Sequence, residues 1–168
     1  VERANALRYV LHFVGDVHQP LHCVACDNER TPKGDRGGNE FIFDPFPVGT
    51  YQVKNLHFLW DIGGGLYGDT PRPLTDRTQI DALRDRLMAQ HPIDTMPEVA
   101  IEDPERWAQE GLMLAQTVVY ALPERKIPSE SYLAATQFIS GRRLALAGYR
   151  LANLLNRAFG DQTELSRL

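Results

Sequence analysis

Two short stretches of the sequence each place a histidine four residues before an aspartate. The pairs are His12 with Asp16 and His57 with Asp61. On a helix, residues four apart lie one turn above each other on the same face. An imidazole and a carboxylate in that arrangement can bind one metal ion, as the two histidines of H-E-x-x-H do. The spacing therefore indicates metal-binding chemistry.

The residues around His12 help to distinguish metal ligation from an ordinary hydrogen bond. A pair of His–Asp hydrogen bonds on surface helices would give the same spacing. Residues 6–14, however, are strongly apolar and contain too few polar positions for a solvent-exposed face. An isolated buried charge is costly unless it is paired or bound to a metal. We therefore expect His12 to lie in buried surroundings and favour metal ligation.

His22 adds a third donor to the second pair. His22, His57 and Asp61 supply two imidazoles and a carboxylate, the usual ligands of a catalytic zinc whose fourth position stays open. His12 and Asp16 form half of a neighbouring site, in which the two oxygens of Asp16 could bridge two ions. Closely spaced zinc ions suit in-line attack at phosphorus, because one generates hydroxide near neutral pH and the others stabilise the attacking and leaving oxygens.

Two further groups near these donors are candidate site residues. Gln19 and His18 could orient the ligands from behind. For His18, a packing or surface position is an equal alternative. Gly37, Gly38 and Asn39 form either an ordinary turn or a bend that presents the Asn39 amide, a donor–acceptor pair suited to a base edge.

Cys23 and Cys26 form a C-x-x-C directly after His22. We expect a structural disulfide, either between these two residues or to a residue upstream of this chain. A thiolate metal site and a redox pair are the alternatives.

Length and composition indicate one globular domain over residues 1–168. The hydrophobic share of 43% and the charged share of 24% are ordinary for such a domain. The net charge is −4, and there is no basic cluster beyond Arg142-Arg143, so extended electrostatic binding of duplex nucleic acid is not expected. Any phosphate chemistry must therefore depend on metal ions. No apolar run approaches the roughly 20 residues of a membrane span. We expect neither a membrane partner nor an obligate protein partner.

The residue pattern predicts a mainly α fold. Pro20 ends a first helix, and Asp103 caps a later helix that has Pro104 at its first position. A long loop follows the first helix, and such loops are usually functional. The expected helices cover about 3–18, 55–62, 76–90, 104–122 and 129–160, and the expected loop covers 20–54 with a short strand at 39–44.

Four motifs together closely resemble the zinc-dependent single-strand-specific nucleases, the class I nuclease/3′-nucleotidase family of fungi, plants, protists and bacteria. The motifs are H-F-V-G-D-V-H-Q-P-L-H at 12–22, G-D-R-G-G-N at 34–39, N-L-H-F-L-W-D at 55–61 and A-G-Y-R-L-A-N-L-L-N at 147–156. They span nearly the whole chain. The resemblance implies a multi-helix phospholipase C/nuclease-like domain with a long ligand-bearing loop and three zinc ions in a cleft.

The resemblance also implies a role for each metal-binding candidate. His22, His57 and Asp61 match the ligands of the more separate zinc. His12 matches a ligand of the closely spaced zinc pair, and Asp16 matches the catalytic carboxylate that bridges this pair.

The same resemblance implies the substrate and the reaction. Gly37, Gly38 and Asn39 match the loop that contacts the nucleobase. The expected reaction is hydrolysis of single-stranded DNA and RNA by a metal-bound hydroxide, which leaves 5′-phosphates, together with removal of the phosphate from 3′-mononucleotides. A secreted, periplasmic or lumenal location is also implied.

The chain departs from the family pattern in two ways. The N-terminal ligands of the family have no counterpart, so the chain, which starts at Val1, resembles the C-terminal part of such an enzyme. It would complete one zinc site, contribute to the others and be inactive alone. Arg36 precedes the Gly37-Gly38 pair where a smaller apolar residue is expected, and the base preference is open.

Two other functions fit parts of the pattern. A zinc-dependent phospholipase C would share the fold and a similar ligand set, but Asp61 in place of a glutamate and the Gly-Gly-Asn loop favour the nuclease. A non-catalytic helical module with one structural zinc is the second alternative. Structural zinc sites normally close with four protein ligands, whereas only three are evident unless a cysteine joins them.

Overall fold

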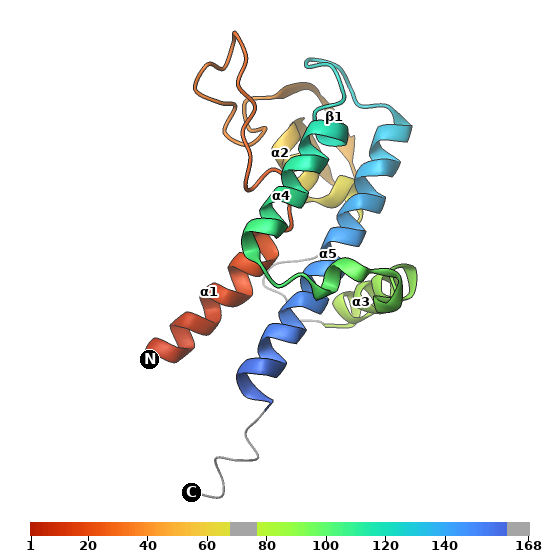
Figure 1. Ribbon diagram of the computed structural model, residues 1–168. Coiled ribbons are helices and arrows are strands. Elements are labelled where there is room, and N and C mark those ends of the chain that lie inside the picture. The colour runs from red at the N-terminus through yellow and green to blue at the C-terminus, as the bar shows by residue number, and fades with distance from the viewer. Residues whose placement is uncertain (68–76, 161–168) are drawn as a thin grey trace, which may run out of the picture.

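The computed structural model describes residues 1–67 and 77–160 and confirms a mainly α-helical fold (Figure 1). No helix among these residues is long and apolar enough to cross a membrane. The α-helices are α1 (Glu2–Asp16), α2 (Leu56–Asp61), α3 (Thr78–Gln90), α4 (Pro104–Leu114) and α5 (Glu130–Phe159). A two-stranded antiparallel sheet comprises β1 (Ile42–Val48) and β2 (Tyr51–Asn55). Short helical turns are η1 (Gly63–Gly65), η2 (Ile93–Thr95), η3 (Pro97–Ala100) and η4 (Ala115–Val119), the last a π-helical turn.

The long helix α5 is the element on which the others are assembled. Helices α1 and α3 and the turns η1 and η3 all pack against it. Figure 1 shows the hairpin and α2 near the N-terminal end of α5, and α1 beside its C-terminal half. The turn that follows α1 therefore enters the region between α5 and α2.

The main hydrophobic core immobilises α2, the helix that carries His57 and Asp61. Trp60 is 1% exposed, and its indole N–H donates to the hydroxyl of Tyr132 on α5 at 3.1 Å. The Tyr132 hydroxyl in turn donates to the carbonyl of Val119 at 2.5 Å. The buried members of this core are Leu21, Phe41, Phe43, Phe46, Val48, Val53, Leu56, Leu59, Trp60, Ala115 and Val119.

The β-hairpin lies inside the segment that was predicted as a loop with one strand at 39–44. Strand β1 instead begins at Ile42, and the prediction lacked β2 altogether. Val48 pairs with Tyr51 across a two-residue turn in which Gly49 has a φ of +60°. Two prolines inside β1 conceal the strand pattern, because proline cannot donate to a sheet ladder.

Two predicted helix ends differ from the structure. Helix α1 ends at Asp16, before the predicted end at 18, and the chain continues in turns. Helix α4 ends at Leu114 and continues as the π-helical turn η4 to Val119, so the α-helix predicted to 122 is too long. The start predicted for α3 at residue 76 lies outside the described residues.

Side-chain caps explain where three helices begin. Asn55 accepts from the Phe58 N–H at 2.8 Å. Asp103 and Ser129 accept in the same way at the starts of α4 and α5. Each cap satisfies a backbone donor that has no partner within the helix. The starts of α2, α4 and α5 therefore follow from the sequence, as predicted.

The burial that we expected around His12 is not found in the described part of the chain. The His12 side chain is 67% exposed. Tyr9 and Phe13 are 61% and 57% exposed, and Val14 is the buried residue of α1. The apolar stretch fails to bury His12 because α1 contacts the rest of the described chain near its last turn.

A buried cluster of charged side chains joins α4, α5 and the turn after α1. Glu110 accepts from Arg143 at 2.5 Å and from Arg150 at 2.6 and 2.9 Å. Arg150 also lies over the Trp107 ring, with its guanidinium carbon 5.1 Å from the ring centroid. Two arginines sharing one carboxylate cost less to bury than unpaired charges would.

His18 completes this cluster as a neutral ring. Its Nε2 lies 2.9 Å from Nη1 of Arg150, which can only donate, so Nε2 is an acceptor and Nδ1 carries the proton. Nδ1 donates to the Val14 carbonyl at 2.7 Å. Burial and the positive charges of Arg143 and Arg150 lower the pKa of His18 to about 4.

The neutral His18 ring should make stability depend on pH. Below the ordinary pKa of 6.5 the unfolded chain binds a proton that the folded chain excludes, so stability present above pH 6.5 is lost as the pH falls towards 4. The expected loss is about 3 kcal/mol between pH 7 and pH 4. Urea unfolding at several pH values measures it. His18→Gln should flatten this dependence, whereas His12→Gln, at an exposed position, should keep it; equal slopes in all three proteins would contradict the assignment.

Candidate metal centre

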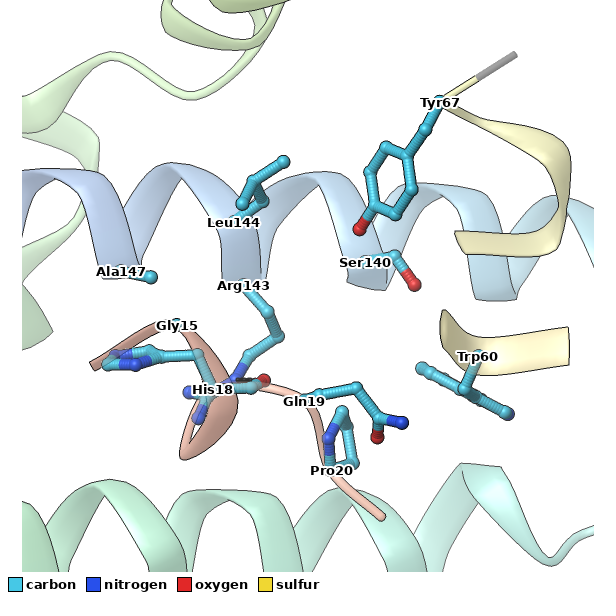
Figure 2. A pocket seen from close by; sticks show the side chains of 10 residues that line it. All are labelled: Gly15, His18, Gln19, Pro20, Trp60, Tyr67, Ser140, Arg143, Leu144 and Ala147. Atoms are coloured by element: carbon cyan, nitrogen blue, oxygen red, sulfur yellow. Dashed lines mark hydrogen bonds between the residues drawn. The ribbon is translucent and has the colours of Figure 1, made fainter. Parts of the chain in front are cut away.

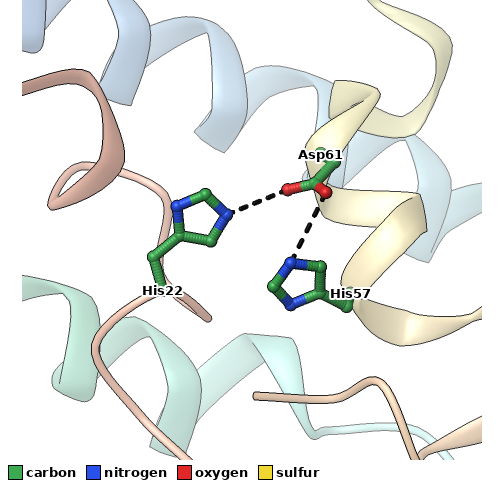
Figure 3. A group of neighbouring side chains, drawn as sticks. All are labelled: His22, His57 and Asp61. Carbon is green, nitrogen blue, oxygen red and sulfur yellow. Dashed lines mark hydrogen bonds and ion pairs between the residues drawn. The ribbon is translucent and has the colours of Figure 1, made fainter. Parts of the chain in front are cut away.

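His22, His57 and Asp61 converge from two separate segments of the chain (Figure 3). His22 lies in the turn region after α1, and the other two residues lie one turn apart on α2. One donor atom from each lies within 4.8 Å of the others. Nε2 of His22 is 3.1 Å from Oδ1 of Asp61, and Nε2 of His57 is 3.5 Å from Oδ2. The structure thus brings together the three residues predicted to form one complete site.

The orientation of His57 is set by the backbone of the Gly-Gly-Asn loop. Its Nδ1 lies 2.7 Å from the carbonyl oxygen of Gly37, which can only accept, so Nδ1 carries the proton. The backbone N–H of His57 donates to the Gly38 carbonyl at 3.2 Å. Nε2 therefore faces Asp61, as in metal sites where the second imidazole nitrogen is bound to a carbonyl.

The two glycines of this loop are required by both conformation and space. Gly37 and Gly38 have φ values of +64° and +81°. A Cβ on Gly37 would lie 2.4 Å from the Leu21 carbonyl oxygen, a backbone atom that cannot easily move. Arg36 has a φ of +56°, an uncommon conformation for a residue with a side chain.

Asn39 remains available at the surface of this loop. It is exposed, and its Nδ2 donates to the carbonyl of Arg36 at 2.9 Å. The loop geometry accounts for His57 without using the Asn39 amide oxygen. The base contact predicted for Gly37, Gly38 and Asn39 therefore stays a prediction.

Asp35 anchors the long loop, a role that sequence reasoning missed. It is 2% exposed and accepts from the Cys26 N–H at 3.0 Å and from the Tyr120 hydroxyl at 2.8 Å. Burial and the neighbouring carboxylate raise the pKa of Tyr120 well above its ordinary range. The position of Asp35 inside the G-D-R-G-G-N motif was the available signal, whereas nothing in the local sequence marked Tyr120.

Gln19 is bonded to Asp61, and its predicted role in orienting the ligands stays a prediction. Its Nε2 donates to Oδ1 of Asp61 at 2.9 Å, and its Oε1 accepts from the Leu21 N–H at 2.5 Å. Burial raises the pKa of Asp61, but hydrogen bonds from His22 and Gln19 outweigh this and lower it overall. The hydrogen bond to Asp61 is the main cause that raises the pKa of His22. The carboxylate is thus held ionised, the form that binds metal.

Asp16 links its predicted partner His12 to the group formed by His22, His57 and Asp61. Its Oδ2 lies 3.1 Å from Nε2 of His12, and its Oδ1 lies 3.5 Å from Nδ1 of His22. The two oxygens therefore face different histidines, an arrangement compatible with the bridging role predicted for Asp16. Its role and that of His12 as ligands stay predictions.

His18 is not brought to the metal centre. It is 2% exposed and bonds Val14 and Arg150 rather than any of the predicted ligands. Of the two alternatives left open by the sequence, the structure shows the packing position. Sequence reasoning also missed Arg143 and Glu110, since charged residues on helices normally indicate a solvated face.

The disulfide expected between Cys23 and Cys26 is not formed, and both are free cysteines in the structure. Cys23 is exposed, and the Cys26 thiol lies 3.9 Å from the carbonyl of Asp27. The backbone N–H of Cys26 donates to Asp35, which fixes this end of the segment. Pairing of either residue with an upstream cysteine stays a prediction.

The chain matches known nucleases over most of its length. The family model described as S1/P1 Nuclease matches residues 1–160. Endonuclease 4 of Arabidopsis thaliana is 32% identical over 94% of this chain and 52% of its own length. Nuclease P1 of Penicillium citrinum is 29% identical over 95% of this chain and 59% of its own length. Nuclease S1 of Aspergillus oryzae is 37% identical over 36% of this chain and 17% of its own length.

Gly37→Ala should disturb the metal centre through His57. The new Cβ meets the Leu21 carbonyl, and the φ of +64° is strained by about 1–3 kcal/mol for a residue with a side chain. We expect lower stability and weaker zinc binding, measured by chemical unfolding and by competition with a chromophoric chelator. Gly148→Ala is the matched control, because its Cβ would meet nothing within 4 Å. Equal zinc affinity in the two variants would contradict the role of Gly37.

Proposed function

Because this chain belongs to the S1/P1 nuclease family, we propose that it forms part of a zinc-dependent nuclease that cleaves single-stranded DNA and RNA to 5′-phosphorylated products. Removal of the phosphate from 3′-mononucleotides is part of the same proposal. The observation that carries it is the convergence of His22, His57 and Asp61 within a chain of this family. The chain spans about half the length of the curated relatives it matches, so the activity concerns the whole protein.

The residues present fit a zinc ion. His22, His57 and Asp61 would hold it, since two imidazoles and a carboxylate are the ligand types of a catalytic zinc with one open position. The Gly37 carbonyl already selects the His57 tautomer that ligation needs. When bound, zinc lowers the pKa of a water ligand and stabilises charge on phosphoryl oxygens.

His12 and Asp16 would contribute to further zinc ions. In the proposal the complete protein holds three, with the remaining ligands supplied from outside this chain. Asp16 can serve two ions because its oxygens face His12 on one side and His22 on the other. Ions held by His12 and Asp16 would stabilise charge on the attacking and leaving oxygens.

The residues around Asp61 prepare the site before any substrate binds. Gln19 donates to Oδ1 of Asp61, which keeps the carboxylate oriented and ionised. The Gly37 carbonyl holds the Nδ1 proton of His57. Preorganised ligands of this kind need little rearrangement on binding, and loss of such supporting contacts typically costs 10–100-fold in metal affinity or activity.

Asn39 is proposed to read an unpaired base. Its amide lies at the surface two residues from Gly37, the residue that contacts His57. A donor–acceptor pair can bond the Watson–Crick edge of a base only where that edge is not already paired. With a net charge of −4, the chain is poorly suited to holding a duplex by its phosphates. Both features support single-stranded substrates.

Membership of the nuclease family favours this function over the two alternatives. Neither a phospholipase C nor a non-catalytic zinc module would explain the Gly-Gly-Asn loop or the similarity to named nucleases. A secreted, periplasmic or lumenal location accompanies the proposal and is supported by the family resemblance alone.

Hydrolysis of single-stranded DNA by the full-length protein tests the function. We expect release of 5′-nucleotides that a chelator abolishes and added zinc restores, with little cleavage of duplex DNA. A protein that binds zinc but releases no nucleotide would instead support a phospholipase or a non-catalytic relative, which assays on phosphatidylcholine vesicles would separate.

His57→Ala in the full-length protein should abolish this activity and remove about one zinc per molecule. The variant deletes a ligand whose Nε2 lies 3.5 Å from Asp61. His91→Ala is the matched control, because His91 lies at the end of α3 against Phe138. Metal content by mass spectrometry and the rate of hydrolysis are the two measurements. Full zinc content and rate in the His57 variant would overturn the ligand assignment.

A further inference from the structure

Arg143 connects the buried charge cluster to the turn that precedes the metal centre. Its side chain is 8% exposed on α5. Nε donates to the His18 carbonyl at 2.9 Å, Nη1 donates to Glu110 at 2.5 Å, and Nη2 donates to the Trp107 carbonyl at 3.3 Å. One guanidinium therefore holds α4 and the turn in fixed positions relative to each other.

The carbonyl held by Arg143 belongs to a chain of linked turns. The Gln19 N–H donates to the Asp16 carbonyl at 3.0 Å, and the His22 N–H donates to the Gln19 carbonyl at 3.1 Å. The side chains of Gln19 and His22 both reach Oδ1 of Asp61, at 2.9 and 3.1 Å. A shift of the His18 carbonyl would therefore move two of the three groups that meet at Asp61.

The turn has room to shift on the side that faces Arg143. A cavity of about 60 Å³ lies there, bordered by Gln19 and Pro20 on one side and by Arg143 and Ser140 of α5 on the other (Figure 2). Close packing would hold the turn by contact alone. Because a cavity replaces part of that packing, the position of the turn depends more on the hydrogen bond from Arg143.

We propose that Arg143 is a positioning residue for the metal centre, acting through the His18 carbonyl on Gln19 and His22. The inference rests on the proposed zinc site. Arginine is suited to the role because its planar fork directs donors towards three acceptors at once. A lysine keeps the charge beside Glu110 but cannot reproduce the three directions.

Arg143→Lys in the full-length protein tests the proposal. We expect its zinc affinity at the triad to fall 10–100-fold, with kcat reduced and KM for single-stranded DNA nearly unchanged. Arg142→Lys is the matched control: its side chain is bonded to Glu98 and is 32% exposed, away from the turn. Zinc affinity is measured by competition with a chromophoric chelator. Equal affinity in the two variants would overturn the proposal.

Glu110→Gln separates positioning from stability. It removes the negative charge shared by Arg143 and Arg150 but leaves the bond to the His18 carbonyl, so we expect a lower unfolding midpoint with near-normal zinc affinity. Two results would make Arg143 a structural residue and overturn the inference. One is a zinc affinity that falls in proportion to the unfolding midpoint across the three variants, and the other is an Arg143→Lys protein that does not fold. If His57→Ala, with Arg143 intact, left zinc binding unchanged, the proposed site itself would be overturned, which is a different result.

Discussion

The arrangement of this chain depends on one half-buried carboxylate between two buried arginines. Glu110 neutralises Arg143 and Arg150, and these two hold the backbone and the ring of His18. A single buried pair is weak support for stability, but removing one partner leaves an uncompensated charge and is costly. The cluster therefore acts mainly as a geometric constraint. Its bonds to the carbonyl and the ring of His18 fix the path of the chain just after α1.

The sequence predicted those parts of the fold that are governed by local rules. Periodicity and capping residues gave α2, α4 and α5 their starting positions, and Asn55 caps as its residue type predicts. The hairpin was missed because Pro45 and Pro47 interrupt the strand pattern of β1. The strand forms through its pairing with β2, which the local sequence does not show. The exposure of α1 could not be predicted either, since an apolar stretch does not reveal whether a partner surface lies within the chain.

The convergence of His22, His57 and Asp61 was predictable because their types and spacing together limit the possible chemistry. Their supporting contacts were predicted only in part. Gln19 followed from its position beside the ligands, but the Gly37 carbonyl is a backbone group, and no residue pattern shows which carbonyl an imidazole will meet. The sequence thus identifies donors, whereas the folded chain determines their tautomers and orientations.

The π-helical turn η4 has a consequence for how this chain tolerates changes of length. It places Tyr120 so that its hydroxyl reaches Asp35 across the long loop. The turn holds one residue more than an α-helical turn, so a deletion there restores an ordinary α-helix with the later residues nearly in place, whereas an inserted residue would rotate everything after it by about 100°. Tyr120 would then face away from the loop. An insertion in η4, far along the chain from any ligand, is therefore expected to release the long loop from Tyr120, whereas a deletion of one residue is not.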